Sequence, residues 1–133
     1  MKNPFRIVFI CTGNYCRSPI AEALLKQRLQ QTGLDTQADV VSAGTVALNG
    51  SPPSAGAQYA VRQMGATLDG FESMQLTEDI CDNAHLLLVM EQDHREYIED
   101  RFPAHAKKVV LLGEMLPQGN PLDIPDPIGA ENN

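Results

Sequence analysis

An apolar stretch that ends in a cysteine constrains the fold of this chain most strongly. Residues 5–10 (FRIVFI) are short, apolar and partly β-branched, which predicts a buried strand. Cys11 and a five-residue loop follow, and the loop leads into Arg17-Ser18-Pro19. Ser18 is a favourable N-cap and Pro19 a favourable first helical residue, so we expect a helix to begin here. The stretch therefore predicts a strand, a tight loop and a helix in direct succession.

Strand-like and helix-like segments alternate along the rest of the chain. Further strands are expected at residues 38–42, 84–90 and 107–112. The expected helical segments are residues 18–32, a helix from 51–54 to 65, a short turn at 77–81, and 91–102. This alternation predicts an α/β fold, with a four-stranded parallel sheet flanked by helices on both faces. Sites in such sheets lie beyond the carboxyl ends of the strands, where Cys11 stands.

The composition excludes several classes of function. With 133 residues, we expect a single domain over residues 1–133. The formal net charge is −7 and the ten Lys and Arg are scattered, so we expect no nucleic-acid partner and no binding to anionic membranes. The longest apolar runs are under ten residues, too short to span a membrane. The first residues also lack the apolar core of a signal peptide.

The cysteines and histidines are few. Cys11, Cys16 and Cys81 form an odd, low count without a secretory signal, which predicts reduced thiols and a cytoplasmic location. There is no CxxC pair, and the three histidines lack the spacing of metal ligands. We therefore expect no metal site.

Cys11 and Arg17 flank a loop suited to a tetrahedral oxyanion. A cysteine attacks as its thiolate, which a nearby arginine and a helix N-terminus stabilise. Successive backbone N–H groups between residues 12 and 18 can form an anion nest, and the helix dipole adds to it. The guanidinium of Arg17 can grip two phosphate oxygens. The loop therefore predicts both phosphate binding and nucleophilic attack, whereas an isolated Cys11 would be a buried structural thiol.

The pattern Cys11-x5-Arg17-Ser18-Pro19 resembles the phosphate loop of the low-molecular-weight protein phosphatases. Further matches follow in the family's order, at Ser42-Ala43-Gly44-Thr45, Leu76-Thr77, Met90-Glu91 and Asp126-Pro127. The resemblance covers nearly the whole chain. It implies the three-layer α/β/α fold of phosphotyrosine protein phosphatase I. It also implies hydrolysis of phosphotyrosine in phosphorylated proteins, without a metal or any other cofactor.

The resemblance gives each site residue a role. Cys11 is the nucleophile that forms a cysteinyl-phosphate, while Asp126 protonates the leaving group and then activates water. The phosphate-binding residues are Thr12, Gly13, Asn14, Tyr15, Cys16, Arg17 and Ser18. Hydrogen bonds from Asn14, Ser18 and Ser42 support the loop, and Ser18 also donates to the thiolate. Asp126 lies in a proline-rich loop, whereas no histidine lies in an obviously suitable loop; the alternative for Asp126 is a turn-forming Asp-Pro pair.

Two loop residues keep alternative interpretations. Cys16 is either a small buried residue under the loop or, under oxidant, the disulfide partner of Cys11 that shields the nucleophile. Tyr15 stands where isoleucine resembles the phosphotyrosine enzymes and threonine resembles the protein-arginine phosphatases. Its ring would stack on an aromatic substrate, narrow the mouth of the site, or lie on the rim.

Other departures from the family pattern bear on the substrate and on the surface. Ile128-Gly129 resembles the arginine-phosphatase branch, so a protein-arginine phosphatase is the main alternative function. Phe71 stands where many relatives have a histidine. The chain stops before the long C-terminal helix of relatives, so we expect a domain truncated at its C-terminus. An uncovered sheet face would then favour self-association.

Two further functions are less favoured. Thiol-dependent arsenate reduction needs two further cysteines to relay a disulfide outward, and only Cys81 lies beyond the loop. A non-catalytic phosphate-binding module would not need the nucleophile, the arginine and the acid together.

Overall fold

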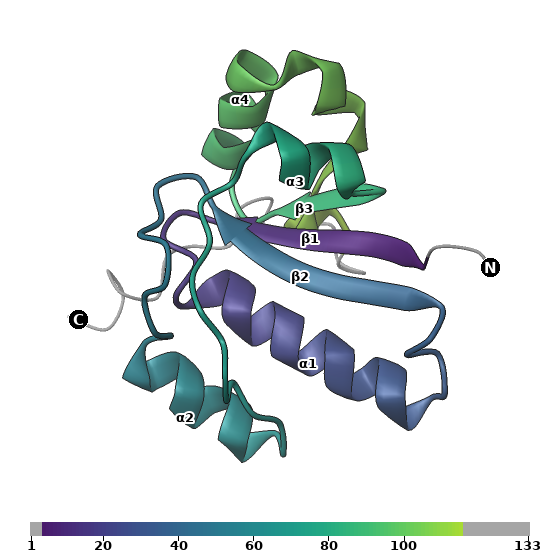
Figure 1. Ribbon diagram of the computed structural model, residues 1–133, viewed down its shortest axis with the longest axis vertical. Helices are drawn as coiled ribbons and strands as arrows, with labels where there is room; N and C mark the ends of the chain where they lie inside the picture. Colours follow the sequence, from purple (N-terminus) through teal and green to yellow (C-terminus); the bar gives the residue numbers. More distant parts are fainter. Residues whose placement is uncertain (1–3, 116–133) are drawn as a thin grey trace.

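Four parallel strands form the centre of the protein (Figure 1). The computed structural model describes residues 4–115. The strands are β1 (Phe5–Cys11), β2 (Ala38–Gly44), β3 (Leu86–Val89) and β4 (Val109–Leu111). They pair in the order β2-β1-β3-β4, and each pair is parallel. The predicted four-stranded parallel sheet is therefore confirmed.

Helices cover both faces of this sheet. They are α1 (Arg17–Gln31), α2 (Ala55–Gln63), α3 (Glu78–Asn83) and α4 (Gln92–Arg101), with the 3₁₀ helices η1 (Pro103–Lys108) and η2 (Leu112–Met115). Figure 1 shows α1 and α2 on one side of the sheet and α3 and α4 on the other. The predicted arrangement of three layers is thus present.

Alternation along β1 sends its side chains into two separate cores. Val8 and Ile10 are buried on the α3/α4 side, in a cluster that includes Ile98 of α4. Phe9 and Cys11 belong to the opposite cluster, against which residues of α1 pack. The thiol of Cys11 therefore lies on the side of the sheet from which α1 starts.

The predicted N-cap of α1 is wrong. The helix begins at Arg17, its N-cap is Cys16, and no side chain caps it. The Ser18 hydroxyl instead contacts Cys11 and Asn14 in the preceding loop. A short hydroxyl side chain can serve either purpose, and here the buried loop uses it.

The fourth strand is shorter than predicted. The expectation was a strand over residues 107–112, but η1 continues through Lys108 and β4 holds only Val109–Leu111. Pro103 starts η1, where its fixed φ suits the first position of a helical turn.

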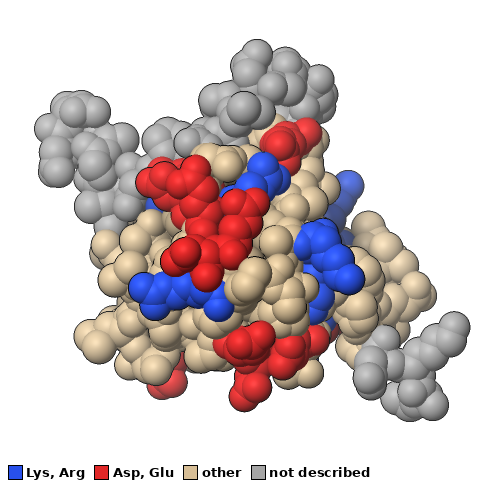
Figure 2. All heavy atoms as spheres, turned by 90° about the horizontal axis from the view of Figure 1, so that it is seen from above, with Lys and Arg blue, Asp and Glu red and all other residues tan. Residues whose placement is uncertain are grey.

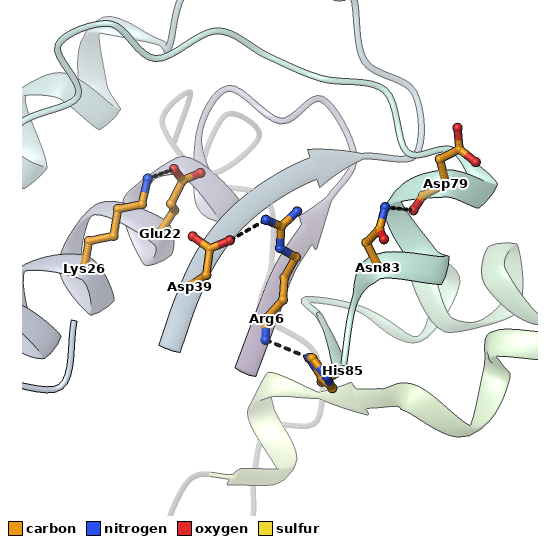
Figure 3. Close-up of polar contacts among 7 residues, drawn as sticks. All are labelled: Arg6, Glu22, Lys26, Asp39, Asp79, Asn83 and His85. Atoms are coloured by element: carbon orange, nitrogen blue, oxygen red, sulfur yellow. Dashed lines mark hydrogen bonds and ion pairs between the residues drawn. The ribbon is translucent and has the colours of Figure 1, made fainter. Parts of the chain in front are cut away.

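Charged side chains lie mainly on the surface. On the face seen in Figure 2, Asp and Glu form compact groups with smaller groups of Lys and Arg beside them. Arg6 and Asp39 are paired across β1 and β2 at 2.6 Å (Figure 3), but they are 41% and 34% exposed. Such an exposed ion pair contributes about 0–1 kcal/mol to the free energy of unfolding. Among the helices within residues 4–115, none has the length and apolar character needed to cross a membrane.

Burial of Cys81 predicts a pH-dependent loss of stability. Burial raises the pKa of this thiol from 9.0 to about 11. The unfolded chain would ionise Cys81 near its usual pKa, whereas the folded chain keeps it neutral to higher pH. This contribution to stability is therefore complete below pH 9.0 and is lost as the pH rises toward about 11. Its upper limit is about 2–3 kcal/mol.

We expect Cys81→Ala to remove this part of the pH dependence, so the stability difference between the two proteins should shrink as the pH rises from about 8 to about 11. Urea unfolding of both proteins between about pH 8 and about pH 11 measures it. Equal pH dependence in the two proteins would contradict the prediction.

Candidate active site

The loop of residues 12–16 lies against the carboxyl end of β2. Cys11 and Gly44 are register partners, and the Thr45 N–H donates to the Cys11 carbonyl at 3.0 Å beyond the strand ends. A Cβ at Gly44 would lie 2.5 Å from the Thr12 carbonyl oxygen and 2.9 Å from the Asn14 nitrogen. Such contacts are too short for any side chain. The glycine therefore permits the loop to approach β2 this closely.

Asn14 fixes the shape of the loop. Its φ is 55°, a left-handed conformation that Asn tolerates better than most residues, and it is fully buried. Its Nδ2 donates to the hydroxyls of Ser18 and Ser42, both at 2.9 Å. Its Oδ1 accepts from the Met74 N–H at 2.7 Å, and its carbonyl accepts from the Ser73 hydroxyl at 2.6 Å. Four positions outside the loop thus hold one loop residue.

Ser18 places a hydroxyl beside the nucleophile predicted from the sequence. The Cys11 Sγ lies 2.9 Å from the Ser18 Oγ, and both residues are buried. The bond from Asn14 occupies a lone pair of this oxygen, so the hydroxyl hydrogen remains available to the sulfur. An ionised Cys11 has no hydrogen of its own. Ser18 therefore donates to a thiolate at this position.

Arg17 brings a buried positive charge to the same loop. It is the first residue of α1, and its side chain is only 6% exposed. Its Nη1 lies 3.1 Å from Oε2 of Glu91, which is the N-cap of α4. The pairing compensates for the cost of burying the guanidinium and orients its donors.

The supporting network continues into α1 through Ser42. The Ser42 hydroxyl donates to Oε1 of Glu22 at 2.6 Å, and Oε2 of Glu22 pairs with Lys26 at 2.6 Å (Figure 3). Phe71 lines a cavity of about 270 Å³ together with Glu22 and Ser42. Lys26 is the cation next to the Glu22 carboxylate.

Histidine 94 is a site residue that the sequence did not predict. Its Nε2 lies 3.0 Å from the Thr12 Oγ1, although the two residues are 82 positions apart. Its other ring nitrogen accepts from the backbone of Glu91 at 3.1 Å. The spacing Glu91-x-x-His94 is that of side chains that bond at a helix start, and this was the available signal. Nothing in the sequence indicates the contact with Thr12.

Tyr15 and Cys16 take defined positions in the loop. A Cβ on Gly13 would lie 2.1 Å from Cε1 of Tyr15, so the tyrosine ring covers the Gly13 backbone. The Tyr15 carbonyl accepts from the N–H of Ser54, the N-cap of α2, at 2.7 Å. Cys11 and Cys16 are both thiols rather than a disulfide.

The structure thus brings together the site residues predicted from 11 to 18 and Ser42. Asp126, the predicted acid, and Ile128-Gly129 lie outside the described residues.

A second cluster offers the donor atoms that a metal ion uses. Nε2 of His105 lies 2.8 Å from Asp82 and 3.3 Å from Glu78, two residues one turn apart in α3. Both carboxylates are more than half exposed, and their direct contacts with the His105 ring account for the arrangement. We assign no metal to this cluster.

Substitution of Asn14 tests whether its side chain holds the loop. We expect Asn14→Ala to lower the free energy of unfolding by about 2–4 kcal/mol, because buried partners lose their hydrogen bonds. We also expect inorganic phosphate to bind at least about tenfold more weakly, because the loop N–H groups lose their alignment. Urea unfolding and titration calorimetry measure the two effects. Asn83→Ala, at an exposed position of α3, is the matched control and should change neither; intact phosphate binding in Asn14→Ala would refute the assignment.

Similar proteins carry names from two kinds of phosphatase. A protein-arginine-phosphatase of Geobacillus stearothermophilus is 38% identical over 127 residues, which are 96% of this chain and 81% of that protein. A probable low molecular weight protein-tyrosine-phosphatase, EpsP of Ralstonia nicotianae, is 37% identical over 121 residues, or 91% of this chain and 77% of that protein.

A solved structure and a family model agree with these relatives. The structure is a mutant of the arginine phosphatase YwlE with a phosphorylated active-site serine. It aligns with a TM-score of 0.86 and 34% identity, over 94% of this chain and 80% of that one. The family model described as "Low molecular weight phosphotyrosine protein phosphatase" matches residues 6–133. The chain therefore belongs to the low molecular weight phosphotyrosine protein phosphatase family.

Proposed function

We propose that this protein hydrolyses phosphotyrosine in phosphorylated proteins through a cysteinyl-phosphate. One observation carries the proposal: the Cys11 sulfur lies 2.9 Å from the hydroxyl of Ser18 in the first turn of α1, the helix that begins with the buried Arg17. A thiolate at this position is stabilised by a hydrogen bond, by the positive end of the helix dipole and by the charge of an arginine. A phosphate at the same place meets the loop N–H groups and the Arg17 fork.

The first step transfers the phosphoryl group to the protein. The Cys11 thiolate attacks phosphorus, an S–P bond forms, and the bond from phosphorus to the phenolic oxygen breaks. Asp126 gives its proton to that oxygen, so a neutral tyrosine leaves. Arg17 and the loop N–H groups stabilise the charge on the three other phosphoryl oxygens.

The second step releases phosphate. Asp126, now a carboxylate, takes a proton from water as the water oxygen attacks phosphorus. The S–P bond breaks, and the electrons return to Cys11 as a thiolate that Ser18 stabilises. The related YwlE structure, a mutant with a phosphorylated active-site serine, supports covalent transfer of the phosphoryl group to the protein. Since the reaction needs a reduced Cys11, we infer that the protein works in a reducing setting such as the cytoplasm.

Phosphoarginine is the second candidate substrate. The relative named protein-arginine-phosphatase is 38% identical to this chain, and the one named protein-tyrosine-phosphatase is 37% identical. Overall sequence identity therefore favours neither phosphotyrosine nor phosphoarginine as the substrate. Arsenate reduction is disfavoured because Cys81 is fully buried, and burial raises its pKa to about 11, which opposes a role in thiol exchange.

Paired kinetics test the function. We expect turnover of a phosphotyrosine peptide with kcat/KM at least about tenfold above that for the same peptide carrying phosphoarginine, as measured by phosphate release under reducing conditions. Cys11→Ser should abolish turnover of both but keep phosphate binding, because the loop donors remain. The reverse preference would assign the arginine substrate. No turnover of either peptide by the reduced protein would refute the enzyme.

Leaving-group dependence tests Asp126. We expect Asp126→Ala to slow an alkyl or phenyl phosphate about 100-fold or more, but a nitrophenyl phosphate far less, because a good leaving group needs no proton. Burst kinetics separate the two steps, since loss of the base also slows hydrolysis of the intermediate. An equal loss of the first step on both substrates would contradict a role as the acid.

A further inference from the structure

His94 connects two parts of the site that the sequence places far apart. It is the third residue of α4 and only 2% exposed. One edge of its ring faces Thr12, the residue directly after the nucleophile. The other edge faces the backbone between β3 and α4.

The hydrogen bonds of His94 determine its tautomer. Its Nδ1 lies 3.3 Å from the Met90 nitrogen and 3.1 Å from the Glu91 nitrogen. Both partners are N–H donors, so Nδ1 must carry a lone pair rather than a hydrogen. The hydrogen of the neutral ring is then on Nε2, which donates to the Thr12 Oγ1 at 3.0 Å.

This single ring touches both halves of the phosphate site. Thr12 begins the loop after Cys11, and its backbone forms part of the predicted anion nest. Glu91 holds Arg17 through its carboxylate at 3.1 Å. A ring that fixes Thr12 and the Glu91 backbone together therefore fixes the nucleophile relative to the guanidinium.

We propose that His94 is a positioning residue of this phosphatase site. As the Nε2–H tautomer, it holds the start of the loop and the start of α4 in register, so that Cys11 and Arg17 address the same phosphoryl group. The inference rests on the proposed phosphatase function. A displacement of about 1 Å in such a site costs about 100-fold in rate.

Three substitutions separate the two edges of the ring. His94→Gln can still donate toward Thr12, His94→Asn can still accept from the backbone N–H groups, and His94→Leu keeps volume but loses both. We expect kcat to fall about 10- to 100-fold in His94→Leu, with KM changed less than about threefold, because alignment matters most in the transition state. The variants His94→Gln and His94→Asn should each have a higher kcat than His94→Leu.

The contact with Thr12 is tested by a double substitution. We expect Thr12→Val, which removes only the hydroxyl, to lower kcat by about as much as His94→Asn. The double variant should then be no slower than either single variant, since both remove one hydrogen bond. Multiplicative losses would overturn the proposed contact. Thr12→Val also decides the question if His94→Leu does not fold.

His105→Gln is the matched control. His105 is likewise buried, but its Nε2 pairs with Asp82 and Glu78 rather than with the loop. We expect His105→Gln to change the unfolding midpoint without changing kcat. If folded His94→Leu keeps kcat within about twofold of the unsubstituted protein, the proposal is wrong.

A second measurement does not depend on turnover. The rate at which iodoacetate alkylates Cys11, and the protection given by inorganic phosphate, can be followed by mass spectrometry. We expect His94→Leu to change the alkylation rate at least about threefold and to weaken protection. If the unsubstituted protein turns over no substrate but these changes occur, the phosphatase function fails while the positioning role stands. If it is active and His94→Leu leaves kcat unchanged, the positioning role fails.

Discussion

The buried side chain of Asn14 is the interaction on which the rest of the site depends. It holds a left-handed backbone conformation in the middle of the loop, and its polar atoms reach β2, α1 and residues 73–74. Each such hydrogen bond contributes about 1 kcal/mol net, but a buried polar atom left without its partner costs more. The loop therefore has one low-energy shape, which these hydrogen bonds fix.

The parallel sheet explains why a strongly acidic chain can still offer an anion site. The net charge is −7, yet the loop that follows β1 is built from backbone amides, a helix start and one buried arginine. β3 ends at the same edge of the sheet and leads to Glu91 and α4. Both helix N-termini thus stand where the strands end, and the local positive field owes little to the overall charge.

Local patterns allowed much of the fold and the loop of the site to be predicted. The four strands follow from short apolar runs, and the loop from Cys11 to Pro19 follows from residues next to one another in sequence. Two uses were predicted for the Ser18 hydroxyl, and the structure has its contacts with the loop but not the cap of α1.

Long-range contacts also escaped the sequence. His94 meets Thr12 across 82 positions, and Ser73 meets Asn14 across 59. No local periodicity carries such information, because these pairs are brought together only by the order of the strands. The role of Asp126 likewise stays a prediction, since it lies outside the described residues.

Gly44 limits the proteins into which residues 11–19 could be transferred. The loop rests on the end of β2, and a Cβ there would lie 2.5 Å from the Thr12 carbonyl oxygen. Residues 11–19 therefore do not form an independent unit. Transferred to another strand–helix unit, they would collide with any neighbouring strand that ends in a larger residue. A protein engineer who transfers this loop to another protein must therefore transfer the end of β2, including Gly44, together with it.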